Sequence, residues 1–157
     1  MTFFILGLHP KLSVAEIKSV VPDLVVLSES EQVLVTEKLN ENLVALQDRL
    51  AGIIKVGNII GEIAEWDETG VSDLVTNSAS GASGKNKISF GFSVYDLGDR
   101  QRTKRIEKEL KKIGGLVKKK LKETGRPVRW VSSKEPILSS VIVEENGLLS
   151  SGGEFVF

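Results

Sequence analysis

Cysteine is absent from the 157 residues, and histidine occurs once, as His9. The lack of cysteine excludes disulfides, thiolate metal sites and a cysteine nucleophile, and it agrees with a reducing, cytoplasmic location. A single histidine leaves no Ser-His-acid triad unless His9 itself serves, and its place before Pro10 favours a turn residue. No apolar run approaches the roughly 20 residues that span a bilayer, so we expect no membrane partner.

Glycine is plentiful, but it forms no complete nucleotide-binding motif. Gly81 to Lys87 matches a Walker phosphate loop only in part. Alanine occupies position 79, where that pattern needs glycine, and Asn86 follows Lys85 where the pattern needs serine or threonine. We therefore interpret Ser78 to Asn86 as a flexible linker.

Charge is balanced over the whole chain but not along it. The formal net charge is zero, with 21 basic and 21 acidic side chains. Residues 1–84 hold 5 basic and 12 acidic side chains, whereas residues 85–157 hold 16 and 9. Within this second part, residues 100–134 carry 14 basic and 3 acidic side chains, a net charge of +11. Such a concentration is typical of a protein that meets a polyanion.

The start of this basic segment has the pattern of a long amphipathic helix. Apolar residues recur at helical spacing: Ile106, Leu110, Ile113, Val117 and Leu121. Asp99 is the expected N-cap, and Gly125 and Pro127 predict the end of the helix. Six lysines fall on the opposite side of the helical wheel and are our first candidates for contact with a polyanion: Lys104, Lys108, Lys111, Lys118, Lys119 and Lys122.

The basic segment continues past this helix. The further candidates for contact with a nucleic acid are Arg126, Arg129, Trp130, Ser132, Ser133 and Lys134. The two serines are either ordinary loop residues or hydroxyl donors to phosphate. Trp130 suits core packing and base stacking equally well. Strand alternation puts Arg129 and Trp130 on opposite faces.

Three classes of function can be compared with this charge pattern. Binding of a polyanion such as a nucleic acid is favoured over a merely solvated helix face, because only two glutamates lie within the helix and the charge continues beyond it. The alternative is a protein-interaction or dimerisation module, in which the basic helix meets an acidic surface, including that of a second copy. A small enzyme with an unrecognised site is disfavoured by the missing histidine and cysteine constellations.

The first part of the chain predicts an α+β unit with the order βαββαβ, the ferredoxin-like arrangement, over residues 1–64. We expect Ser13 to cap the first helix in a capping box with Glu16, Asn42 to cap the second, and Gly52 to end it in a left-handed conformation. The strands are expected at Phe3–Leu8, Leu24–Leu27, Gln32–Thr36 and Ile53–Ile63.

The second part predicts another α/β unit over residues 66–157, with a boundary near Ala64 to Asp67. A short helix is expected around Val71 to Val75. Ile88 to Val94 alternates like a half-buried strand. Pro127–Val131, Ile137–Glu144 and Glu154–Phe157 are expected to complete a meander, with Asn146-Gly147 as a hairpin turn.

Two stretches resemble the tRNA guanosine-10 N2-methyltransferase family and its bacterial relatives. They are FFILGLHPKLSVAEI near the start and GRPVRWVSSKEPILSSVIVEENGLLSSGGEFVF near the end. In that family a ferredoxin-like domain and a THUMP domain precede a Rossmann-type methyltransferase domain. The resemblance implies a ferredoxin-like domain at residues 1–64 and a THUMP-like RNA-binding domain at residues 66–157.

The resemblance also implies a partner and a mechanism. The partner is tRNA, gripped at its single-stranded CCA end by the basic helix and the segment Arg129 to Lys134, with Pro136 to Ser140 beside it. The chain would position this RNA for a catalytic methyltransferase domain, in cis or in trans. The modified base and the oligomeric state, including a homodimer, stay open.

The chain departs from the family in its catalytic signals. The family's methyltransferase half carries an Asn/Asp-Pro-Pro-aromatic motif and a Gly-rich loop for S-adenosylmethionine. The four prolines here are never adjacent: Pro10, Pro22, Pro127 and Pro136. The resemblance then implies a piece of a longer enzyme or a stand-alone binding module, with no catalytic residue, metal or cofactor of its own.

The isolated chain is therefore expected to bind no S-adenosylmethionine and to transfer no methyl group. The reason is that both the cofactor loop and the Pro-Pro motif are missing from the sequence. Isothermal titration calorimetry with the cofactor checks this expectation, and saturable binding at micromolar concentrations would contradict it.

Overall fold

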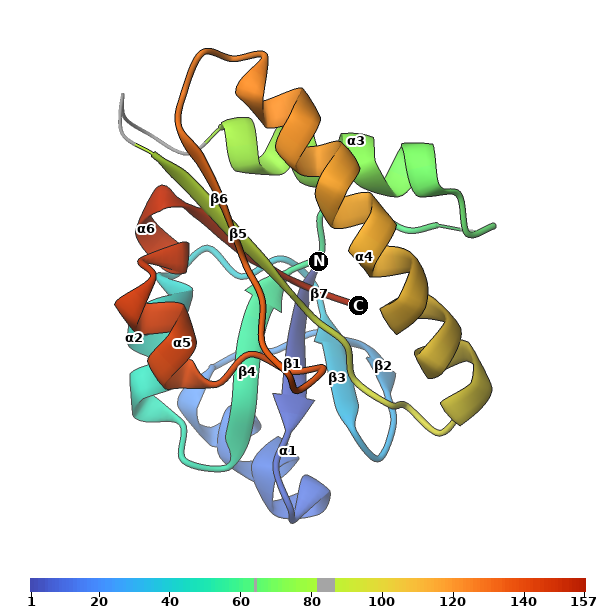
Figure 1. Ribbon diagram of the computed structural model, residues 1–157. Coiled ribbons are helices and arrows are strands. Elements are labelled where there is room, and N and C mark those ends of the chain that lie inside the picture. Colours follow the sequence, from blue (N-terminus) through green and yellow to red (C-terminus); the bar gives the residue numbers. More distant parts are fainter. Residues whose placement is uncertain (64, 82–86) are drawn as a thin grey trace. The chain divides into compact units, whose positions relative to one another are not determined.

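The chain is an α+β protein that divides into two compact units, Met1–Glu62 and Ile63–Phe157. The computed structural model describes residues 1–63, 65–81 and 87–157 (Figure 1). One unit contains an antiparallel sheet and the other a parallel sheet. In these described residues no helix combines the length and the apolar character needed to cross a membrane.

Unit 1, Met1–Glu62, is a four-stranded antiparallel sheet with two helices. The strands lie in the order β2-β3-β1-β4. The elements are β1 (Thr2–Leu6), α1 (Pro10–Val20), β2 (Val26–Glu29), β3 (Val33–Thr36), α2 (Leu43–Arg49) and β4 (Ile53–Asn58). Alternate residues of β1 and β3 point to the helices, so that Phe4, Leu34 and Ile17 are fully buried in one core. This packing of α1 and α2 on the sheet holds unit 1 together.

The predicted capping box at Ser13 and Glu16 is wrong. Helix α1 already begins at Pro10, with His9 as N-cap and no side-chain cap bond. Proline suits the first helical position, because its fixed φ is already helical and an N–H group there would have no partner within the helix. The Ser13 hydroxyl donates to the carbonyls of His9 and Gly52, and the Glu16 carboxylate accepts the N–H groups of Ala51 and Gly52. Both side chains thus anchor the connection between α2 and β4.

Asn42 caps α2 as expected, since its side chain accepts from the N–H groups of Val44 and Ala45. Other expectations for unit 1 are wrong, beginning with strand β1, which ends at Leu6 and not at Leu8. Helix α2 ends in an extended residue, Leu50, and Gly52 has no positive φ. Strand β2 begins at Val26 and not at Leu24. Strand β4 ends at Asn58, because Asn58 pairs with Thr2, the first residue of its partner strand β1.

Unit 2, Ile63–Phe157, is a three-stranded parallel sheet with helices on both faces (Figure 1). The strands lie in the order β6-β5-β7. The elements are α3 (Glu68–Ser80), β5 (Ile88–Ser93), α4 (Arg100–Lys122), β6 (Val128–Val131), α5 (Ser140–Glu145), α6 (Leu148–Ser151) and β7 (Gly152–Val156). Helices α3 and α4 enclose the core around Phe90 and Ile113, while α5 and α6 enclose a smaller core around Leu138 and Leu148.

The expected meander is wrong, because both strand pairs of unit 2 are parallel. The segment expected as a strand from Ile137 to Glu144 instead forms helix α5, whose N-cap Ser139 accepts from the Ile142 N–H. Asn146-Gly147 joins α5 to α6, with Gly147 at φ 60°, and is no hairpin turn. This helical crossover returns the chain parallel to β5. β5 is consequently the central strand, buried on both faces and not half-buried as its alternation indicates.

The predicted linker from Ser78 is wrong at its start, because α3 continues to Ser80. Residues 82–86 of that linker and Ala64 of the expected boundary region lie outside the described residues. Asp67 explains where α3 begins, since its carboxylate accepts the N–H groups of Thr69 and Gly70.

Helix α4 comes close to the sheet at Gly114. A Cβ atom at this position would lie only 2.5 Å from the nearest atom of the Trp130 ring. We therefore expect Gly114→Ala to destabilise unit 2 by about 1–3 kcal/mol through overpacking. Urea unfolding followed by tryptophan fluorescence measures this, because both tryptophans lie in unit 2.

Gly115→Ala is the matched control, because a Cβ at Gly115 would meet no atom within 4 Å. Alanine there should stabilise the helix by roughly 0.5–1 kcal/mol. Equal unfolding midpoints for the two variants would show that the contact between Gly114 and Trp130 is not tight.

Candidate nucleic-acid interface

Helix α4 has the limits and the buried face that the sequence predicts. It runs from Arg100 to Lys122, and the Asp99 carboxylate accepts the Arg102 N–H at its start. Gly125, at φ 76°, follows its end in the left-handed conformation. The apolar stripe is packed in the core, with Ile113, Val117 and Leu121 fully buried. The opposite side of the helix is therefore turned to solvent.

The cations on one flank of α4 are bound by acidic side chains. The Lys120 ammonium contacts Asp73 of α3 at 2.6 Å and the Ser72 hydroxyl at the same distance. The Lys112 ammonium lies 3.4 Å from the Glu68 carboxylate. Helix α3 thus neutralises part of the charge of α4. Within α4, Arg105 pairs with Glu109 at 2.9 Å.

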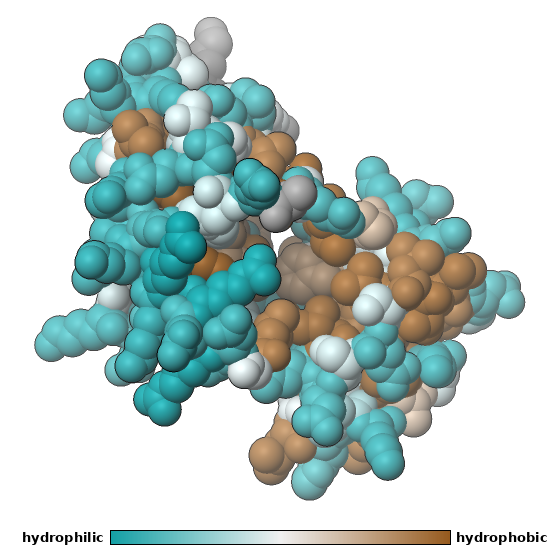
Figure 2. Space-filling model, turned by 90° about the vertical axis from the view of Figure 1, so that its right-hand side faces the viewer, coloured by the Kyte–Doolittle hydropathy of each residue, from teal (hydrophilic) through white to brown (hydrophobic). Residues whose placement is uncertain are grey.

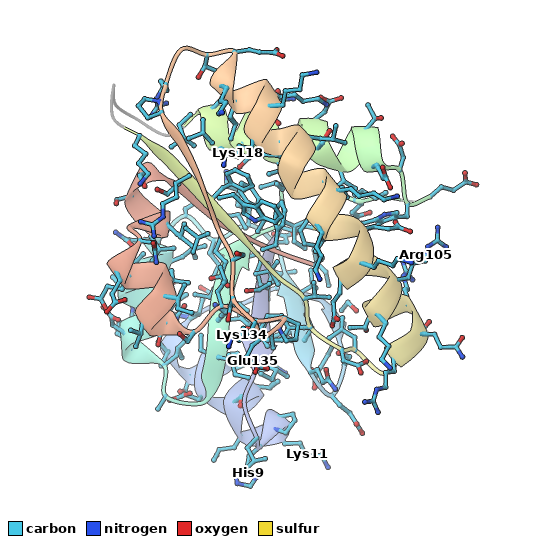
Figure 3. All side chains as sticks on the ribbon, viewed as in Figure 1. His9, Lys11, Arg105, Lys118, Lys134 and Glu135 are labelled. Carbon is cyan, nitrogen blue, oxygen red and sulfur yellow. The ribbon has the colours of Figure 1, made fainter. Side chains whose placement is uncertain are left out.

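The six predicted lysines of α4 form a separate set, which we call the basic face. Its members are Lys104, Lys108, Lys111, Lys118, Lys119 and Lys122, and all six are exposed. Over residues 1–63, 65–81 and 87–157 none of the six takes part in an ion pair or a side-chain hydrogen bond. Figure 3 shows Lys118 and Arg105 on different sides of α4. The basic face can therefore neutralise the charges of an external anion.

The residues after α4 do not extend this face uniformly. Arg126 is half-buried and is engaged by another group. Arg129 is exposed, but it lies two residues before Val131, which packs against Leu138 and Leu148. Because side chains alternate along a strand, Arg129 points to the face of α5 and α6, opposite α4. Trp130 and Val131 pack in different cores, which agrees with the expected alternation along this strand.

Trp130 packs against the core on the α4 side of the sheet. Its ring is parallel to that of Phe90, with an interplanar angle of 3° and centroids 6.4 Å apart. The ring also contacts Phe92 and lies under Gly114 of α4. Of the two interpretations that the sequence leaves open for Trp130, these contacts favour core packing over a platform for a base.

Ser132, Ser133 and Lys134 lie in an exposed loop at the carboxyl end of β6. Since α4 leads from the end of β5 back to the start of β6, this loop is at the Arg100 end of α4. Figure 3 shows Lys118 and Lys134 near opposite ends of β6. The Ser133 hydroxyl accepts the Glu135 N–H, which leaves the Ser133 hydroxyl hydrogen available as a donor. The loop therefore lies beyond the Arg100 end of the helix that carries the basic face.

A buried polar cluster in unit 2 was not predicted from the sequence. The Ser93 hydroxyl donates to the Glu154 carboxylate and accepts the Leu138 N–H. Burial, and secondarily the charge of Glu154, raises the pKa of Tyr95. Ser93 is fully buried, so the cluster fastens the segment before α5 to β5 and β7. The expected strand alternation gave no signal for this arrangement.

Unit 1 offers shallow hollows but no comparable concentration of charge. One is bordered by Gly7, His9, Leu12 and Ile54. Leu8, Leu12 and Ile54 are exposed, and Figure 2 shows hydrophobic side chains at the surface among hydrophilic ones. In the described parts of both units, no three histidine or carboxylate side chains are grouped so that they could hold a metal ion.

Comparison of the chain with protein-family models, with curated proteins and with solved structures finds no match. The basic face and the geometry around it are therefore the basis for a functional proposal.

Lys120 and Lys119 are neighbours in sequence, but only Lys120 is bound by α3. Comparing the two tests whether α4 carries lysines that stabilise the fold and lysines that do not. We expect Lys120→Met to destabilise unit 2 by about 0.5–1.5 kcal/mol, because it removes contacts with Asp73 and with buried Ser72. Lys119→Met should change the stability by less than about 0.5 kcal/mol, because Lys119 is exposed. The urea unfolding midpoints of the two variants check this, and identical midpoints would show that Lys120 contributes no more to stability than Lys119.

Proposed function

We propose that residues 63–157 form a THUMP-like RNA-binding domain. It holds tRNA by the single-stranded 3′ acceptor end and positions it for a methyltransferase domain, in the same chain or in another, in the cytoplasm. The observation that carries this proposal is the basic face of α4, six exposed lysines without an acidic partner in the described structure. In a chain of zero net charge, six unneutralised cations thus lie together on one helix.

The topology of unit 1 and the order of the two units along the chain support the proposal. In unit 1 the element order β1-α1-β2-β3-α2-β4 and the sheet order β2-β3-β1-β4 agree with a ferredoxin-like domain. Unit 2 follows it directly, as the THUMP domain follows in the family that the sequence resembles. The two units therefore occur in the order that the resemblance implies.

In this proposal the side chains of unit 2 have different roles. The lysines of the basic face neutralise phosphates, and this neutralisation gives affinity without reading the sequence. Lys134 and the hydroxyls of Ser132 and Ser133 bind the strand at the Arg100 end of α4. Trp130 acts indirectly, by supporting α4 at Gly114. Arg129 points to the opposite face of the sheet and contributes at most through its charge.

The mechanism is one of positioning. The chain supplies binding energy and a fixed distance between the held end of the RNA and the base that is modified. The methyltransferase domain supplies S-adenosylmethionine and the catalytic residues. Unit 2 therefore affects which RNA is methylated without taking part in methyl transfer.

A contact of the basic face with an acidic protein surface is less well supported. Glu68 and Asp73 of α3, which are candidates for such a surface on a second copy, already bind Lys112 and Lys120. Pairing of the basic face with α3 of a second copy would have to break these contacts first. Unchanged RNA binding after charge reversal on the basic face would favour an acidic protein partner.

We expect the chain to bind tRNA with micromolar affinity and to prefer tRNA with an intact single-stranded end. With about three phosphate contacts to a single strand, log affinity should fall against log salt with a slope near −2. The combined change Lys118→Glu, Lys119→Glu and Lys122→Glu should weaken binding by at least about tenfold and flatten the slope. Fluorescence anisotropy with intact tRNA, tRNA lacking its 3′ end and a duplex measures these effects.

The matched control makes the same change of charge in unit 1, at the exposed residues Lys11, Lys18 and Lys38. This control should leave the affinity for tRNA unchanged within about twofold, because long-range repulsion is screened at physiological salt. Equal weakening by both triple variants would reduce the proposal to nonspecific electrostatics. Unchanged binding after reversal at Lys118, Lys119 and Lys122 would exclude the basic face and favour the acidic protein partner.

A further inference from the structure

Gly115 is exposed in the interior of α4, and packing does not explain it. A Cβ atom at Gly115 would meet no atom within 4 Å, whereas one at Gly114 would overlap the Trp130 ring. Glycine inside a helix is less stable than alanine, because it loses more conformational freedom on folding. Gly114 is thus required by packing, and Gly115 weakens the helix without a contact that needs it.

Gly115 belongs to a row of residues along α4. Residues three or four positions apart lie above one another on a helix. The row consists of Lys104, Lys108, Lys111, Gly115, Lys118 and Lys122, and we call it the lysine row. Each step rises by about 4.5–6 Å, and the row extends over about 27 Å. Gly115 interrupts the row of cations near its middle.

The shape of the lysine row selects among anionic partners. Its five lysines are exposed and unpaired in the described structure, while the cations on the α3 flank, Lys112 and Lys120, are bound. What remains is a file of positive charge along the helix axis, with the exposed Lys119 beside it. A single phosphodiester strand presents its charges in the same way, one after another along a line. An acidic protein surface spreads its carboxylates over two dimensions and matches this file less well.

We propose that one RNA strand runs along the lysine row, parallel to the axis of α4, and makes its closest approach at Gly115. There the absence of a side chain lets a sugar or base contact the helix backbone, a use of glycine that is common where a ligand meets a main chain. This inference rests on the proposed RNA-binding function. It adds the path of the strand and makes Gly115 a residue that determines which strand conformation fits.

The test compares stability with affinity in Gly115→Ala and Gly115→Leu. Gly115→Ala should raise Tm by about 2–6 °C, because alanine is the better helix former. It should nevertheless weaken binding of single-stranded RNA by about threefold, and Gly115→Leu by about tenfold or more. A gain in stability together with a loss in affinity cannot result from partial unfolding. Thermal unfolding and anisotropy titrations with a short single-stranded oligonucleotide measure the two quantities.

Two further variants test whether RNA binding depends on the gap at Gly115. One adds a positive charge in the gap, and the other adds bulk on a different side of the helix. Gly115→Lys adds a cation to the lysine row, so a purely electrostatic face would bind RNA more tightly, whereas a needed gap predicts no gain in affinity. Leu116→Phe adds bulk next to Gly115 in sequence but about 100° around the helix, and it should leave the affinity unchanged. Tighter binding by Gly115→Lys would therefore overturn the inference.

The outcomes distinguish this inference from the function on which it rests. If the unmodified chain binds RNA and Gly115→Leu binds equally well, the path along Gly115 is wrong while RNA binding stands. If the unmodified chain does not bind RNA at all, the proposed function fails, and the inference fails with it. Weaker binding by Gly115→Leu with unchanged binding by Leu116→Phe supports both.

Discussion

The close approach of Gly114 to Trp130 determines how α4 lies on the parallel sheet of unit 2. Trp130 comes from β6, and its ring stacks on Phe90 of the central strand β5, which fixes the ring on the sheet. Only a residue without a side chain allows the α4 backbone to reach the ring. The buried stripe with Ile113 and Val117 then fixes the rotation of the helix about its axis. The distance of α4 from the sheet and its rotation about its axis together decide which lysines face the solvent.

The distribution of charge follows from this placement. Once α4 is fixed, one flank meets Glu68 and Asp73 of α3, whereas the lysines of the basic face form no ion pair among the described residues. The same helix therefore carries cations of two kinds, those that help to dock it and those that remain unneutralised. A net charge of zero for the whole chain conceals this difference, because part of the acidic charge lies in unit 1. For this protein the local arrangement of charge is informative, and the total is not.

Much of the fold could be predicted where the signal was local. The caps Asn42 and Asp99 and the left-handed Gly125 act within a few residues, and the structure confirms all three. Ser13 and Glu16 fit a capping box in isolation, but the structure uses them for bonds to Ala51 and Gly52, which no local pattern could reveal. The β-branched segment of α5 likewise has the composition of a strand, and its packing between Ser139 and Gly147 overrides that preference.

For the candidate interface too, the sequence predicts local features but not contacts between distant residues. Helical periodicity places the six lysines opposite the apolar stripe, and the structure agrees. Periodicity alone could not separate Lys119 from Lys120, because only the position of α3 makes one free and the other bound. For Trp130, alternation along the strand gives the face of the sheet but not what covers it. The contact with Gly114 required the three-dimensional arrangement.

The parallel sheet of unit 2 also has a consequence for the order of events during synthesis. Its central strand β5 pairs with β7 across 63 positions of sequence, as in the pairs Ser89–Gly152 and Phe92–Phe155. Contacts between residues so far apart slow folding, because a long loop must be closed before they form. Unit 1 has all its strands by Asn58 and can fold while the rest of the chain is still being made. The core around Phe90 stays incomplete until Phe155 has left the ribosome, so α4 would spend that interval without its final support.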